Sequence, residues 1–240
     1  MHNILPYLAD INQELLANAD PAHAKGQRAF FKETINPLGV RSKELNTLAA
    51  RRWQELKRLE PEQLLNLCDA LWRSDVFEEP VLASKWCARA VSHLGPDAFA
   101  RFEAWLQTRV GNWAHCDTLC SGCIGGLLIR HPELADRLSH WVTSHNRWVR
   151  RGAAVSLVPA ARRGLLSTHI FRVADLLLED KDDLVRKGYG WLLREASKAR
   201  ADEVFSFVMT RRARMPRVAL RCAIELLPQQ RRALAMQRPS

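Results

Sequence analysis

The sequence predicts an all-α protein built from paired helices. Apolar residues recur with a period close to 3.6 along nearly the whole chain, and no segment shows the sustained two-residue alternation of a strand. Helix-breaking pairs such as Asp20-Pro21, Glu60-Pro61, Gly95-Pro96 and Met215-Pro216 divide the chain into segments of about 12–20 residues. Helices of that length commonly pack in antiparallel pairs.

Composition indicates a soluble globular protein. The 240 residues are 47% hydrophobic and 26% charged, which favours a single domain over residues 1–228, followed by a loose basic tail over residues 229–240. No apolar run reaches the ~18 residues of a membrane span, and the first residues lack a leader pattern. We therefore expect a cytoplasmic or nucleoid-associated bacterial protein and a monomer, with six reduced cysteines instead of a disulfide framework.

The positive charge is confined to the C-terminal part of the chain. Residues 1–140 contain 16 Lys and Arg against 17 Asp and Glu, whereas residues 141–240 contain 20 against 9. Such an excess is typical of a surface that binds a polyanion, because each cation that meets a phosphate releases condensed counterions. General solubility is the alternative explanation.

An internal repeat lies in this basic part. Residues 146–152 (NRWVRRG) match residues 182–188 (DDLVRKG) at an offset of 36, and residues 217–221 (RVALR) form a shorter echo. Each copy begins with a polar cap residue, then places an apolar anchor beside basic residues, and then has a small residue that permits close helix contact. This pattern is typical of HEAT-like repeats, so we expect a helical-repeat solenoid with a concave basic face. Residues 42–59 and 61–73 predict helices of the same kind.

One aromatic and one acidic residue form the first candidate for chemistry. Trp113 and Asp117 follow the glycine break at Gly111 and are four residues apart, so they share a helix face. An aromatic plane beside a carboxylate can stabilise a developing cation. By spacing alone, a half-buried packing residue with a nearby cap is the more common interpretation of such a pair.

A nearby cysteine group suggests a metal site, which we reject. Cys116, Cys120 and Cys123 follow His115 with spacings of four and three, but these spacings fall within a helix, whereas cluster ligands of this type lie on loops. Small core residues account for them, and we expect neither a metal nor an organic cofactor. The sequence has no phosphate-binding loop or dinucleotide fingerprint.

Several segments together resemble a known family. Residues 113–134 (WAHCDTLCSGCIGGLLIRHPEL), 146–154 (NRWVRRGAA) and 184–197 (LVRKGYGWLLREAS) resemble, in order and spacing, the HEAT-like-repeat DNA alkylation repair glycosylases of the AlkD type. Residues 30–52 are also similar to the N-terminal part of that family. The resemblance covers about residues 25–225.

The resemblance implies specific roles for individual residues. The family's catalytic aspartate corresponds to Asp117, its two cleft tryptophans to Trp113 and Trp191, and its cleft arginine to Arg151. A family tyrosine corresponds to Phe30, or to Phe31 if the register differs, so its hydroxyl is lost here. The implied activity is that of a monofunctional glycosylase that removes cationic N3- or N7-alkylated purines from duplex DNA during base excision repair.

The implied chemistry is sound in physical terms. Alkylation makes the purine cationic and hence a good leaving group, so little general-acid help is needed. The sugar left behind resembles an oxocarbenium ion, which a carboxylate such as Asp117 can stabilise while it orients water. The sequence leaves open which adducts are accepted and whether the base is flipped.

Other basic residues are candidates for phosphate contacts, with a solvated helix face as the alternative. Two other functions also remain open. The chain could bind DNA structures without catalysis, which the loss of the tyrosine hydroxyl favours mildly, or act as a protein-interaction scaffold with an acidic partner. The candidate DNA-binding residues, besides Phe30, are Arg150, Arg186, Lys187, Arg194, Arg217 and Arg221.

Overall fold

The computed structural model describes residues 4–237, and these form helices and connecting loops without a strand. The all-α prediction is therefore confirmed. The chain groups into two compact units, Met1–Cys123 and Ile124–Ser240, where the sequence predicts one domain over residues 1–228. Each unit buries its own set of apolar side chains. None of the described helices is both long and apolar enough to cross a bilayer.

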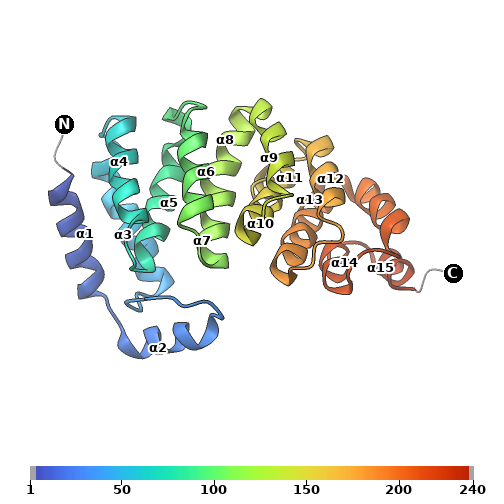
Figure 1. The fold of residues 1–240 in the computed structure, drawn as a ribbon, viewed down its shortest axis with the longest axis horizontal. Helices are drawn as coiled ribbons and strands as arrows, with labels where there is room; N and C mark the ends of the chain where they lie inside the picture. The colour runs from blue at the N-terminus through green and yellow to red at the C-terminus, as the bar shows by residue number, and fades with distance from the viewer. Residues whose placement is uncertain (1–3, 238–240) are drawn as a thin grey trace. The chain divides into compact units, whose positions relative to one another are not determined.

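The first unit is built around α5. Its helices are α1 (Leu5–Ala17), α2 (Pro21–Phe30), α3 (Ser42–Leu56), α4 (Pro61–Trp72), α5 (Glu78–Ala90), α6 (Ala98–Thr108) and α7 (Trp113–Thr118), with a 3-10 turn at Val91–His93. Helix α5 packs against α3, α4 and α7. Fully buried side chains such as Trp86 and Phe102 form the core, and each stabilises the fold by roughly 1.5–3 kcal/mol. Figure 1 shows α2 lying crosswise to α1, α3 and α4.

A buried carboxylate fixes the loop that follows α2. Glu78, at the start of α5, is 1% exposed, and its two oxygens accept hydrogen bonds from the backbone N–H groups of Leu38 (3.1 Å), Gly39 (2.9 Å) and Val40 (3.1 Å). Gly39 has a φ of +86°, and a Cβ there would stand 2.1 Å from the carbonyl oxygen of Asp20. Only glycine fits this position, so the loop has one path from α2 to α3.

The second unit is built around the long helix α13. Its elements are α8 (Gly125–Arg130), a 3-10 turn (Pro132–Arg137), α9 (Leu138–Trp141), α10 (Arg147–Val155), α11 (Val158–Arg162), α12 (Ser167–Leu176), α13 (Asp183–Arg211), α14 (Arg217–Ala223) and α15 (Gln229–Met236). Helix α13 packs against α10, α11, α12, α14 and α15, and its backbone kinks at Arg200.

The repeat seen in the sequence corresponds to equivalent helix starts. The side chain of Asn146 caps α10 by accepting from the N–H of Trp148 at 2.9 Å, and that of Asp182 caps α13 by accepting from the N–H of Leu184 at 2.8 Å. The third copy starts at α14 after Pro216, without a side-chain cap. The shared polar residue is thus a helix cap in the two longer copies.

The C-terminal residues differ from the loose tail expected over residues 229–240. They form α15, in which Ala235 is fully buried, and the Arg212 guanidinium on the segment after α13 donates to the carbonyl of Leu234 at 2.5 Å. This tertiary contact stabilises a segment that composition alone does not identify as helical. Residues 238–240 lie outside the described part of the chain.

Replacing Glu78 by Gln tests the loop anchor. Glutamine offers one acceptor oxygen to three N–H donors and places its own amide hydrogens among them. We therefore expect the free energy of unfolding, measured in urea, to fall by about 3 kcal/mol. Glu62→Gln is the matched control, because Glu62 forms an exposed pair with Arg101 that contributes about 0–1 kcal/mol. Equal midpoint shifts for the two variants would contradict the anchoring role.

Candidate functional site

Trp113 lies in an aromatic cluster in the first unit. The ring of Phe31 stacks on Trp113 with centroids 5.1 Å apart and planes 7° apart, and Phe30 meets it edge-on at 6.2 Å and 76°. Phe77 packs edge-on against Phe31 at 5.5 Å. Both phenylalanines that could replace the family tyrosine therefore contact Trp113, Phe31 by its face and Phe30 by its edge.

Asp117 lies one turn after Trp113 on α7, as its spacing predicts. It is half-buried and lines a cavity of 330 Å³ together with Lys85 and Ser121. The Ser121 hydroxyl donates to the Asp117 carbonyl at 2.6 Å, at the start of a π-helical turn over Leu119–Ile124. Trp113 lines a second cavity of 490 Å³, and Lys85 borders both. The sequence analysis did not single out Lys85, because nothing in its local pattern separates it from a surface lysine.

A neutral histidine fixes the start of α7. The side-chain oxygen of Asn112 caps the helix by accepting from the N–H of His115 at 2.9 Å. The Nε2–H of His115 donates to the carbonyl of Phe77 at 2.8 Å, and its Nδ1 accepts from the Asn112 amide at 3.1 Å. Burial lowers the pKa of His115 to about 4, although the hydrogen bond to Phe77 opposes this shift. Both ring nitrogens thus have structural roles.

The cysteines beside His115 belong to the core. Cys116, Cys120 and Cys123 are all fully buried. Across residues 4–237, no group of three or more His, Cys, Asp or Glu side chains is arranged to hold a metal ion.

Arg151 is a buried residue of the second unit. It lies on α10, is 7% exposed, and donates through Nη1 to the carbonyl of Leu184 in the first turn of α13. A Cβ at Gly188 would stand 3.3 Å from Cγ of Arg151, so the small residue of the repeat allows α13 to approach this side chain closely.

A buried carboxylate that the sequence analysis missed holds Trp191. The indole N–H of Trp191 donates to Glu195 at 3.2 Å, and Glu195 is 1% exposed. Arg162 (2.7 Å), Lys198 (2.7 Å) and Arg194 (2.9 Å) also donate to it. Burial raises the pKa of Glu195, but these three cations outweigh it and bring the pKa down to about 2. The available signal was the spacing of four between Trp191 and Glu195 on one helix face.

The basic residues predicted to bind DNA differ in the hydrogen bonds and ion pairs that they already form within the protein. Arg150 is paired with Asp180 at 2.6 Å, and Arg186 donates to the Asp180 carbonyl at 2.5 Å. Arg194 is also firmly held, because it pairs with the buried Glu195 (2.9 Å) and with Glu225 (3.2 Å). The other three are more weakly held: Lys187 pairs with Asp183 (3.3 Å), Arg217 donates to the Met236 carbonyl (3.4 Å), and Arg221 has no hydrogen bond or ion pair to any residue of 4–237. Exposed pairs of this kind contribute about 0–1 kcal/mol to stability, so they hold their side chains only weakly.

The predicted site residues are divided between the units. The first unit brings together Phe30, Trp113 and Asp117, and the second holds Arg151 and Trp191. Their roles remain predictions.

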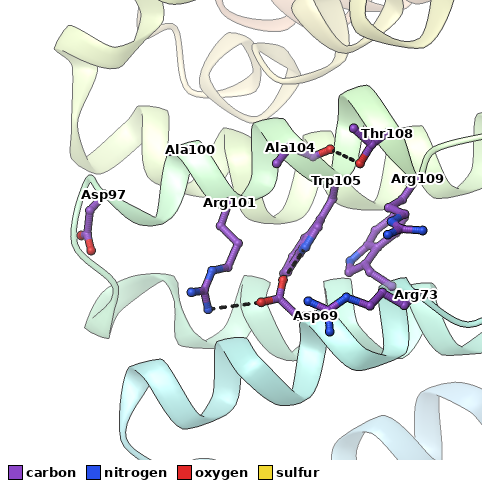
Figure 2. A pocket seen from close by; sticks show the side chains of 10 residues that line it. Asp69, Arg73, Asp97, Ala100, Arg101, Ala104, Trp105, Thr108 and Arg109 are labelled. Atoms are coloured by element: carbon purple, nitrogen blue, oxygen red, sulfur yellow. Dashed lines mark hydrogen bonds and ion pairs between the residues drawn. The ribbon is translucent and has the colours of Figure 1, made fainter.

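A separate cavity of 450 Å³ lies between α4 and α6 and contains none of the predicted site residues. Figure 2 shows Asp69 at its centre, where the Trp105 indole donates to it at 2.7 Å and Arg101 pairs with it at 3.5 Å. Trp72 stacks on Trp105 and meets His115 edge-on at 5.7 Å. Trp72, which lines this cavity, therefore also packs against His115 of α7.

Comparison with known proteins agrees with this architecture. The family model described as "DNA alkylation repair enzyme" matches residues 11–227. A structure titled as a predicted DNA alkylation repair enzyme from Enterococcus faecalis superposes with a TM-score of 0.79 at 17% identity, covering 88% of this chain and 98% of that one. The crystal structure of AlkD2 from Streptococcus mutans superposes with a TM-score of 0.60 at 17% identity, covering 76% and 89%. No curated protein sequence matches the chain.

These helices and the family match define the class of protein as a helical DNA repair protein. The chain belongs to the DNA alkylation repair enzyme family, which indicates a role in the repair of alkylated DNA.

The charge on Glu195 predicts how stability depends on pH. Because folding lowers the pKa of Glu195, its stabilising effect is complete above its ordinary value of 4.5 and is lost as pH falls towards about 2. At pH 7 we expect Glu195→Gln to reduce the free energy of unfolding by about 3 kcal/mol, because three cations lose their partner. The difference from the native protein should shrink between pH 4.5 and 2 in denaturant titrations. If the difference in unfolding free energy between the two proteins stays constant with pH, the charge of Glu195 does not contribute to stability.

Proposed function

We propose that the protein is a monofunctional DNA glycosylase that hydrolyses the N-glycosidic bond of cationic N3- or N7-alkylated purines in duplex DNA and leaves an abasic site. The observation that carries this proposal is the pairing on α7 of a half-buried Asp117 with Trp113, whose ring is fixed by Phe31. Membership of a DNA alkylation repair family supports it.

The proposed mechanism uses the aspartate as an electrostatic group. As the bond to the cationic base breaks, positive charge moves onto the deoxyribose, and the Asp117 carboxylate stabilises it while orienting the attacking water. The π face of Trp113 adds a second attraction for the same charge. The base leaves as a neutral purine, so the site needs neither a strong general acid nor a cofactor.

The second unit supplies the remaining proposed contacts. Arg151 is rigidly placed by its buried position, and Trp191 by Glu195. We assign both to the deoxyribose and phosphate of the lesion, with the more weakly held cations, such as Lys187 and Arg221, on flanking phosphates. The protein then acts as a cytoplasmic or nucleoid-associated monomer that places a basic face against the duplex.

Base release from duplex containing 7-methylguanine or 3-methyladenine tests the enzyme proposal. We expect Asp117→Asn to lower the single-turnover rate about 100-fold or more while duplex affinity stays the same, because a neutral amide cannot stabilise the sugar cation. Asp136→Asn is the matched control, since Asp136 is 76% exposed and, within residues 4–237, its carboxylate pairs only with His169.

Two results would redirect the proposal. Tight duplex binding without release of any methylated or bulkier adduct favours a DNA-structure-binding protein, which the missing hydroxyl at Phe30 would suit. No duplex binding even at low salt favours a protein-interaction scaffold.

A further inference from the structure

Three groups around one cavity of the first unit lack the partner that their chemistry requires. The cavity of 490 Å³ is lined by α2, α3, α5, α7 and the loop after α2, and its size lies within the roughly 300–1,000 Å³ of small-ligand pockets. Gln27 carries a buried side-chain oxygen without a hydrogen-bond donor. Lys85 forms no hydrogen bond or ion pair with any residue of 4–237. Phe30 leaves 72% of its surface exposed.

Gln27 requires a hydrogen-bond donor. A buried acceptor without a partner is destabilising, and within residues 4–237 nothing donates to its Oε1. The terminal torsion of glutamine rotates over a broad range, so the amide can turn its oxygen towards the cavity that it lines. An amide presents a donor and an acceptor side by side, which is the pattern that reads the edge of a nucleobase.

Lys85 requires an anion. It is half-buried, and burial, with a smaller effect of Arg89, lowers its pKa. Glu78 lies on the same cavity, but its oxygens already accept three backbone hydrogen bonds. Because Lys85 also borders the cavity of Asp117, an anion bound here lies next to the proposed chemistry. A cationic alkylpurine would be repelled by this ammonium group, whereas a phosphate would be attracted.

Phe30 requires a flat apolar partner. Its contacts with Phe31 and Trp113 are both edge-to-face, at 83° and 76°, so its ring is held in place but largely uncovered. Stacking of a base on such a ring is favourable whatever the base, because every base has a π face.

We propose that this cavity binds a single unstacked nucleotide of duplex DNA, with its base on Phe30, its base edge on Gln27 and its phosphate on Lys85. The base of a nucleotide is a planar ring with hydrogen-bond donors on its edge, and its phosphate is an anion, so one nucleotide carries all three missing partners. The three groups line one cavity. The proposal rests on the proposed DNA role, but it adds a binding site distinct from the hydrolytic action of Asp117. The bound nucleotide is one without an alkyl charge, such as an unpaired neighbour of the lesion.

Binding to duplex with one unpaired adenine tests the site by fluorescence anisotropy. We expect the native protein to bind this bulged duplex about tenfold more tightly than the fully paired duplex, as one stacked base would provide. Gln27→Leu should remove most of this preference and leave the affinity for paired duplex unchanged. Gln13→Leu, on the exposed face of α1, is the matched control and should keep the preference. Circular dichroism confirms that each variant is folded.

Lys85→Gln gives a second, independent readout. Losing one phosphate contact should reduce the slope of log affinity against log salt for the bulged duplex by about 0.9. Lys57→Gln is the control and should leave the slope unchanged, because Lys57 is exposed and, within residues 4–237, its ammonium group hydrogen-bonds only Gln54. Equal affinity for bulged and paired duplex, or a preference that persists in Gln27→Leu, overturns the proposal. If free deoxyadenosine monophosphate binds as tightly as the bulged duplex, the proposal that the nucleotide comes from DNA is wrong. None of these duplexes carries an alkylated base, so the outcome does not depend on whether base release is observed.

Discussion

The arrangement of the first unit depends on the Glu78 carboxylate. The loop between α2 and α3 buries three consecutive N–H groups that no helix or sheet satisfies, and Glu78 accepts all three. This ties α2, which lies crosswise to its neighbours, to the first turn of α5 (Figure 1). The phenylalanines at the end of α2 can then meet Trp113 at a fixed angle, and the cavity beside it has a defined wall.

The same principle recurs in the second unit, where the donors to the buried carboxylate are mostly cationic. Glu78 is satisfied by neutral backbone donors, whereas Glu195 is satisfied by three cations and one indole. In each unit a buried acid orients an aromatic residue of the proposed site. Such acids are costly to bury alone, so they are found where every oxygen has a donor.

The sequence predicts helix starts and spacings well, because these depend on residues close together in the chain. Asn146 and Asp182 cap their helices as expected, and Trp113 and Asp117 share α7. It does not predict the long-range partners, because Glu78 binds a loop about 40 residues earlier and nothing in its local pattern differs from an ordinary first-turn acid. Gln27 is missed for the same reason, since an unpaired side-chain oxygen can be recognised only once all its neighbours are in place.

Stacking of Phe31 on Trp113 covers one of the two faces of the indole ring. One face is covered by the Phe31 ring at 5.1 Å, so a residue 82 positions earlier in the chain decides which face of the indole can meet another molecule. This restriction is steric. It neither titrates nor weakens with salt, so the geometry at Trp113 persists under conditions where contacts between exposed charges are screened.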